Sequence, residues 1–114
     1  MLCENPSLAT AAFNGQFAND PKQIAALYRP RDPADKTALD AMNTLFKDAE
    51  RLRANARAVR NDAAGDGCEW VMSVDLSWTN SFGQPRRKTV QMRTELEAVN
   101  GAPRVRRIFG GSGF

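Results

Sequence analysis

The fold of this chain is decided by residues 74–108, "VDLSWTNSFGQPRRKTVQMRTELEAVNGAPRVRRI", which contain two turn signals and three runs of alternating apolar and polar residues. Alternation with a period of two is typical of strands that bury one face. Asn100-Gly101 is the preferred pair for a two-residue hairpin turn, because both central residues adopt positive φ. A weaker candidate strand, at 54–60, precedes these three runs. The sequence therefore predicts four antiparallel strands, at 54–60, 69–79, 88–98 and 102–109.

The Asn-Gly turn also predicts the register of the last hairpin. Counting outward from the turn, Ala98 faces Pro103 in a pair that needs no hydrogen bond from the proline. The next apolar pairs are Leu96–Val105 and Met92–Phe109. On the other face lie pairs of opposite charge, Glu97–Arg104 and Glu95–Arg106. Each exposed charge pair is expected to contribute about 0.2–1 kcal/mol.

Three helix starts precede the strands. Each is an Asn or Asp followed by proline, which combines an N-cap acceptor with a residue whose φ is already helical. They are Asn5-Pro6, Asp20-Pro21 and Asp32-Pro33. The predicted helices cover residues 6–17, 21–28 and 33–53. The third has the clearest apolar stripe, formed by residues three and four apart, namely Leu39, Met42, Leu45, Phe46, Ala49 and Leu52.

These elements predict an α+β fold with three N-terminal helices packed on a curved, four-stranded antiparallel meander. The chain of 114 residues is long enough for one core. We expect a single domain over residues 1–109 and a flexible tail over residues 110–114.

Composition excludes several classes of site. The chain has no histidine and only two cysteines, so Ser-His-Asp and Cys-His machinery is excluded and too few soft ligands remain for zinc or haem. We expect no metal, no cofactor and no membrane span. The cysteines leave two alternatives open. In a cytosolic protein both thiols stay reduced, whereas in an exported protein Cys3 would be joined to Cys68.

Two groups of residues are candidates for binding. A cavity between the sheet and the helices would be lined by Tyr28, Met42, Phe46, Trp70, Met72 and Trp78. The opposite, polar face of the sheet offers Ser73, Asp75, Gln91 and Arg93. The basic run at residues 85–88 could instead bind nucleic acid, but the alternation directs both tryptophans to the other face, away from any stacking position. We therefore expect no nucleic-acid binding and no catalytic residue.

The element order resembles that of the cone-shaped nuclear transport factor 2-like superfamily. The resemblance rests on "TLFKDAERLRANARAVRND" (44–62), "CEWVMSVDLSWTNSFGQPRRKTVQMRTELEAVNG" (68–101) and "APRVRRI" (102–108). That superfamily includes ketosteroid-isomerase-like and polyketide-cyclase-like enzymes, transport adaptors and assembly domains, so fold alone does not assign an activity. The resemblance implies dimerisation through the outer sheet face. The chain departs from the pattern because it lacks a strand pair after the second helix and an Asp/His set facing the cavity.

From these observations we expect a non-catalytic ligand- or protein-binding domain that belongs to a larger protein or assembly. Its partner would be another protein, a second copy of the chain or a small apolar ligand. The alternative is a small enzyme of the ketosteroid-isomerase or polyketide-cyclase-like type, acting on an apolar substrate in the cavity.

Overall fold

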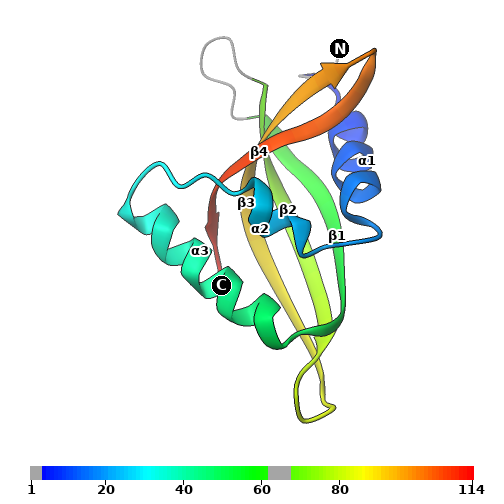
Figure 1. Ribbon diagram of the computed structural model, residues 1–114. Helices are drawn as coiled ribbons and strands as arrows, with labels where there is room; N and C mark the ends of the chain where they lie inside the picture. The colour runs from blue at the N-terminus through cyan, green and yellow to red at the C-terminus, as the bar shows by residue number, and fades with distance from the viewer. Residues whose placement is uncertain (1–3, 62–67) are drawn as a thin grey trace.

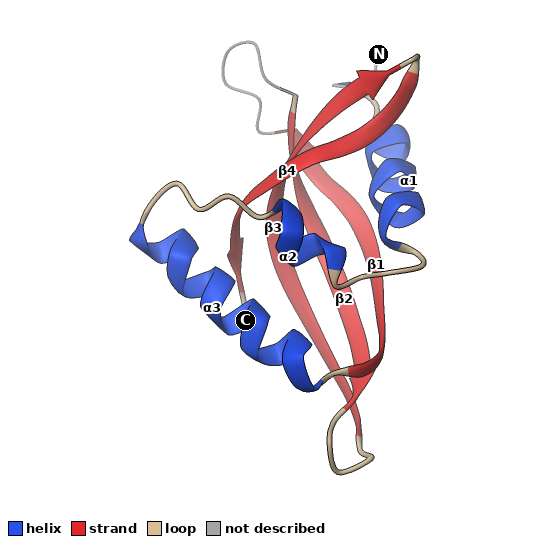
Figure 2. Ribbon diagram, viewed as in Figure 1, coloured by secondary structure: helices blue, strands red, loops and turns tan. Residues whose placement is uncertain are grey.

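A computed structural model describes residues 4–61 and 68–114 of the chain. Three helices come first and four strands follow (Figures 1 and 2). The elements are α1 (Pro6–Phe17), α2 (Gln23–Leu27), α3 (Pro33–Asp48), β1 (Glu50–Asn61), β2 (Glu69–Thr79), β3 (Pro85–Val99) and β4 (Ala102–Ser112). The strands form one antiparallel sheet in the order β1-β2-β3-β4, so each strand pairs with its neighbours in the sequence.

The predicted fold class is wrong in its helical layer. Three packed helices were expected, but α2 is a five-residue segment, and only α1 and α3 are full helices. Asp20-Pro21 does not start the second helix: Lys22 occupies the N-cap position of α2 and makes no side-chain capping bond. The sheet accounts for most of the C-terminal part of the chain. What the structure shows is an α+β fold with a four-stranded antiparallel sheet.

The other two Asx-Pro pairs do start helices. The side chain of Asn5 accepts hydrogen bonds from the backbone N–H groups of Ser7 and Leu8, and Asp32 accepts one from Asp35 at 2.8 Å. The third helix ends at Asp48, five residues earlier than its apolar stripe predicted, because Ala49 is extended and β1 begins at Glu50. Leu52 continues the stripe in sequence but is buried from the strand.

The hairpin between β3 and β4 turns at Asn100 and Gly101, whose φ angles are 53° and 80°. The predicted pairs Leu96–Val105, Glu97–Arg104 and Ala98–Pro103 are confirmed. Beyond them the predicted register is wrong, because β4 contains two irregularities. Each gives β4 one extra residue, so Glu95 faces Arg107 rather than Arg106, and Met92 faces Gly111 rather than Phe109.

The second irregularity changes the environment of Phe109. Its ring lies under two guanidinium groups. The Cζ atom of Arg31 is 4.0 Å from the ring centroid, and that of Arg107 is 4.6 Å from it. Phe109 is therefore buried by cations rather than by the apolar interior. Residues 110–112, expected in a flexible tail, continue β4, and the ring of Phe114 packs against the core.

Helix α1 contacts both edge strands of the sheet. The amide side chain of Asn14 donates to the carbonyl of Ala56 in β1 at 3.0 Å and accepts from its N–H at 2.7 Å. Gln16 makes the same pair of bonds with Val105 in β4, at 3.0 and 2.6 Å. Each amide replaces the missing neighbouring strand, which satisfies backbone groups that an edge strand otherwise leaves open.

Cys68 takes part in a disulfide. Cys3, the partner considered from the sequence, lies outside the described residues.

The two amide contacts lead to a prediction about stability. Replacing Asn14 or Gln16 by alanine leaves one backbone donor and one acceptor without partners, so we expect each change to lower the free energy of unfolding by about 1–3 kcal/mol. Urea unfolding would measure the loss. Gln23→Ala is the matched control, since its side chain bonds only to exposed Asp20, at 3.3 Å. Equal small losses in all three variants would contradict the assignment.

A second prediction concerns the shifted register. Glu95 contacts Arg107 most closely, and its distance to Arg106 is 4.0 Å. Double-mutant cycles should therefore give a larger coupling energy for Glu95–Arg107 than for Glu95–Arg106, within the range of about 0.2–1 kcal/mol that partly exposed pairs reach. A larger coupling energy for Glu95–Arg106 would contradict the shifted register and support the uninterrupted one.

Candidate functional site

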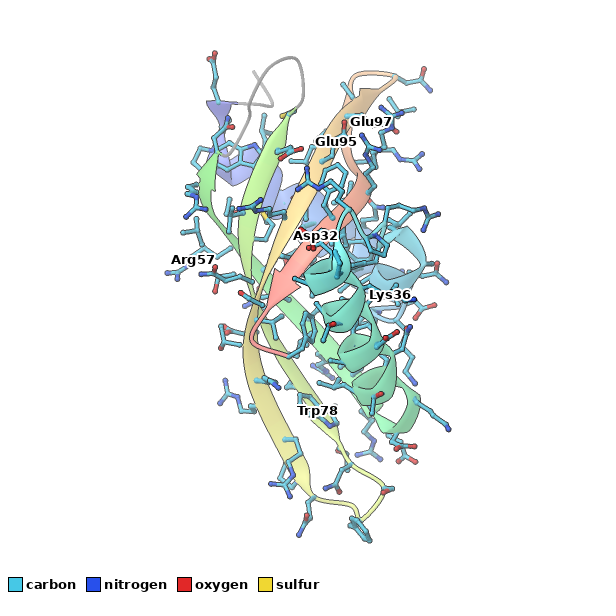
Figure 3. All side chains as sticks on the ribbon, turned by 90° about the vertical axis from the view of Figure 1, so that its left-hand side faces the viewer. Asp32, Lys36, Arg57, Trp78, Glu95 and Glu97 are labelled. Atoms are coloured by element: carbon cyan, nitrogen blue, oxygen red, sulfur yellow. The ribbon has the colours of Figure 1, made fainter. Side chains whose placement is uncertain are left out.

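The six candidate cavity residues lie in the hydrophobic core or pack against it. Five of them are buried, Tyr28, Met42, Phe46, Trp70 and Met72, and Trp78 is half-buried against the same cluster. Trp78 points toward the side of the sheet that α3 covers (Figure 3). Three pockets on the described part of the chain are lined by other residues. The structure thus brings the six candidates together as packed side chains.

The core of the described residues contains one buried polar residue, Thr94, apart from the tyrosine and tryptophan side chains. Its hydroxyl donates to the carbonyl of Trp70 at 3.1 Å. No carboxylate is buried in this part of the chain. General acid–base catalysis within the core would require such a group or a phenol of suitable pKa.

Tyr28 is the one phenol of the chain, and it is only 2% exposed. Its hydroxyl is buried and meets no partner at hydrogen-bonding geometry. Burial raises the pKa of Tyr28 to about 12, and the carboxylates of Asp35 and Asp32 act in the same direction, while the nearby backbone of Gly111 has a smaller opposite effect. The phenol is therefore neutral at physiological pH.

The opposite face of the sheet is not covered by a helix in the described part of the chain (Figures 1 and 3). The four interface candidates, Ser73, Asp75, Gln91 and Arg93, all lie on it. Ser73 pairs directly with Gln91, and Asp75 pairs with Thr89, whose hydroxyl donates to Asp75 at 2.6 Å. Arg93 lies in the next row, opposite Val71. The structure thus brings these four residues onto one surface.

Three exposed arginines join this surface, Arg53 and Arg57 from β1 and Arg87 from β3. Arg57 points away from the sheet on the side opposite α3 (Figure 3). Among the described residues, none of the three forms an ion pair or a side-chain hydrogen bond. The sequence identified them as basic residues, but the weak alternation of β1 gave no reason to assign them to one face. We use the name arginine face for the surface formed by these three arginines and the outward-facing residues of β2 between them, Ser73, Asp75 and Ser77.

Charges near the hairpin between β3 and β4 are arranged differently. Arg31 lies 3.5 Å from Glu69, Arg104 lies 3.5 Å from Glu97, and Glu95 binds Arg107. These basic groups are neutralised by carboxylates on the same molecule. The three basic residues of the arginine face have no such carboxylate neighbour among the described residues.

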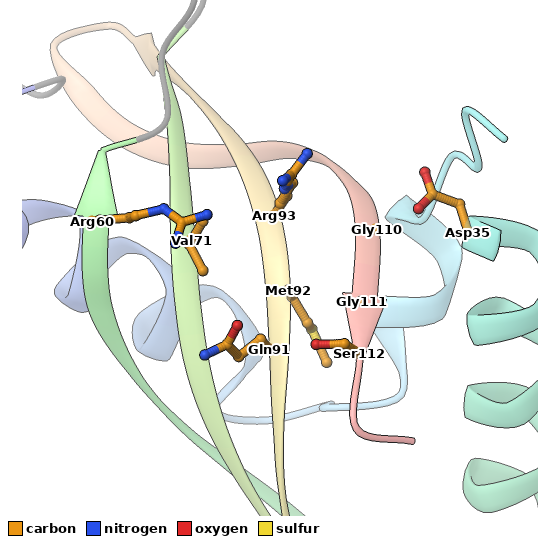
Figure 4. A pocket seen from close by; sticks show the side chains of 9 residues that line it. All are labelled: Asp35, Arg60, Val71, Gln91, Met92, Arg93, Gly110, Gly111 and Ser112. Atoms are coloured by element: carbon orange, nitrogen blue, oxygen red, sulfur yellow. The ribbon is translucent and has the colours of Figure 1, made fainter.

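A cavity of about 300 Å³ lies at the end of β4, between the start of α3 and the sheet (Figure 4). Its lining includes Asp35, Gln91 and Arg93. A Cβ atom at Gly110 would lie 2.6 Å from a carboxylate oxygen of Asp35, so a side chain there would displace that carboxylate. Gln91 and Arg93 connect this cavity to the outer face.

The turn between β2 and β3 presents an aromatic ring to solvent. Phe82 is 85% exposed. The turn is nevertheless well ordered by Asn80, whose side-chain oxygen accepts from the N–H groups of Phe82 and Gln84 at 3.0 and 2.9 Å. A single exposed apolar side chain is common on protein surfaces, so Phe82 does not by itself mark a site.

Two other kinds of site are absent from the described residues. No group of three His, Cys, Asp or Glu side chains is arranged to hold a metal ion. No helix there has the length and apolar character needed to cross a membrane.

Comparisons with known proteins identify no functional relative. No family model matches the chain, and no curated protein matches it. Three solved chains do match. One is a five-substitution variant of Rd1NTF2_05, a name that contains the abbreviation of nuclear transport factor 2. It is 14% identical, with 93% of each chain covered and a TM-score of 0.44. This likeness concerns the fold alone and assigns neither a family nor an activity to the chain.

The buried phenol leads to a prediction about pH. Tyr28→Phe removes a buried hydroxyl that has no partner, so we expect stability at pH 7 to stay the same or to increase. The pKa of Tyr28 is higher in the folded state than in the unfolded state. The stability linked to keeping this phenol neutral is therefore fully present below pH 10 and is lost as the pH rises toward 12. Chemical unfolding at several pH values should show a smaller alkaline loss in the variant. A marked loss of stability at pH 7 would contradict the unpaired state of the hydroxyl.

Proposed function

We propose that this chain is a non-catalytic binding domain that captures a protein partner with the outer face of its sheet. The observation that carries the proposal is the contrast between the two faces. Apolar side chains fill the inner face, whereas the outer face is open and carries exposed arginines that form no ion pair in the described part of the chain.

Electrostatic complementarity supports a partner of negative charge. Exposed arginines without carboxylate neighbours attract an acidic surface and increase the rate of association. Arginine is also enriched at protein interfaces, as are aromatic side chains such as Phe82. Phe82 lies in the turn that precedes β3, the strand of Arg87. Three guanidinium groups on one face of the sheet are suited to an acidic protein partner.

Self-association through this face is less well supported. In a symmetric dimer, the same patch meets itself. Arg53, Arg57 and Arg87 would then lie against a patch that carries the same three arginines, and Asp75 is the one carboxylate among them, already bonded to Thr89. Like charges placed opposite each other are destabilising. We therefore propose a different, acidic protein as the partner.

Catalysis on an apolar substrate, the alternative considered from the sequence, has one supporting observation, the unpartnered hydroxyl of Tyr28. This hydroxyl is sealed among core side chains and does not line any of the three pockets. A phenol with a pKa near 12 also makes a poor general base at neutral pH. The binding role is better supported.

A native mass spectrum of the untagged, non-reduced protein tests this proposal. We expect the mass of the polypeptide alone or of a complex with another protein, because the core is filled. An additional mass of a few hundred daltons that is lost on denaturation would show a small molecule in the interior and would overturn the proposal in favour of a ligand-binding or catalytic cavity. The mass of a stable dimer would contradict the choice of an acidic partner over a second copy.

A further inference from the structure

The arginine face has a regular arrangement of charges across three strands. Three consecutive outward-facing rows run across β1, β2 and β3. The rows are Arg53–Ser77–Arg87, Asn55–Asp75–Thr89 and Arg57–Ser73–Gln91. The middle strand contributes short side chains, whereas the first and third rows contain the long arginines. Shorter side chains along β2 therefore lie between strands that carry longer, positive groups, and we call this strip along β2 the trough.

The dimensions of a sheet give the trough its scale. Neighbouring strands lie about 4.8 Å apart, so β1 and β3 are separated by roughly 10 Å across the trough. Residues on one face of a strand repeat every two positions, at about 6.6 Å. Arg53 and Arg57 are four residues apart on β1, which places their backbones roughly 13 Å from each other. An extended segment lying along β2 has the same repeat as the rows beneath it.

A negative charge lies at the centre of these rows. Asp75 occupies the row between the two arginines of β1, and its position is fixed by the hydrogen bond from Thr89 at 2.6 Å. The sequence of charges along the trough is therefore positive, negative, positive. A uniformly acidic segment would place a carboxylate over Asp75, where like charges repel.

We infer that the arginine face recognises an extended protein segment with acidic residues at positions i and i+4 and a basic or hydrogen-bond-donating residue at position i+2. The two acids pair with the outer rows, and the residue between them pairs with Asp75. This inference rests on the proposed function and specifies the charge pattern of the partner. Because the pattern is the same in both directions, the segment can run parallel or antiparallel to β2.

A protein segment fits this surface better than single-stranded nucleic acid. A nucleic acid carries a phosphate at every nucleotide, so it cannot leave out the charge that faces Asp75. Binding of single strands also relies on bases stacking on aromatic rings. The nine side chains of the three rows include no aromatic group. Nucleic acid is accordingly one of the outcomes that the test must separate.

Titration of the ¹⁵N-labelled protein, followed by NMR, tests the inference with two peptides of identical composition. The patterned peptide is acetyl-Thr-Glu-Thr-Lys-Thr-Glu-Thr-amide, and the control is acetyl-Thr-Lys-Thr-Glu-Thr-Glu-Thr-amide. We expect the patterned peptide to shift amide signals of β1, β2 and β3 and to bind at least about threefold more tightly than the control at low salt. Oligothymidylate of matched length is titrated in parallel.

Three variants assign the contacts. Arg57→Ser should weaken binding of the patterned peptide about fivefold or more, whereas Arg104→Ser, an exposed arginine already paired with Glu97, should leave it unchanged. Asp75→Asn keeps an acceptor for Thr89 but removes the charge, so it should abolish discrimination between the two peptides. The spectrum of each variant reports directly whether it is folded.

The other outcomes overturn the inference in distinguishable ways. Equal binding of both peptides on the arginine face would disprove the charge pattern and leave a general acidic partner, and so the proposed function, in place. Tighter binding of oligothymidylate would assign the face to nucleic acid. Absence of binding, or shifts confined to other residues, would remove the inference altogether, while the native mass spectrum independently decides whether the interior holds a ligand.

Discussion

Two side-chain amides of α1 hold the curvature on which the rest of the structure depends. A four-stranded sheet has two open edges, and here Asn14 binds one edge at Ala56 while Gln16 binds the other at Val105. Both amides belong to one helix. The first and last strands therefore cannot move apart without breaking the two hydrogen bonds that one of these amides makes to its strand. The sheet is thereby kept curved around α1, and the two contacts also block the pairing of another chain at these points.

The division between an inner and an outer face follows from this curvature. The concave side is narrow enough for two helices and one short helical segment to fill it with apolar side chains. The convex side remains outside the reach of the helices in the described residues (Figure 2). On the outer face, polar side chains are oriented by the register of the strands, and this is the face on which the proposed function rests.

Local signals in the sequence predicted the elements that depend on neighbouring residues. The Asn100-Gly101 turn and the Asn5 and Asp32 caps involve contacts within a few residues, so their chemistry can be read directly. The four strands and the side of the sheet on which Ser73 lies also followed from alternation.

The remaining features depend on contacts between distant residues. The two irregularities of β4 move Phe109 out of the apolar face, and no local signal marks them, since the alternation of Val105 and the residues after it fits either register. The arginine face has the same origin: Arg57 and Arg87 come together only because β1 and β3 flank the same strand. The sequence alone does not distinguish a cavity lining from a packed interior, because large apolar residues fit both, although packed interiors are the usual case.

The contact between α1 and β4 has a consequence for folding during synthesis. Gln16 leaves the ribosome 89 residues ahead of Val105, the residue that it binds. The helix is made well before β4, which forms part of its docking surface, so Phe13 and Phe17 lack their final environment until the closing hairpin has formed. Contacts of such long sequence separation form slowly, and apolar groups that wait for them are open to association with other chains. During synthesis, α1 is therefore the element most in need of protection until β4 has been made.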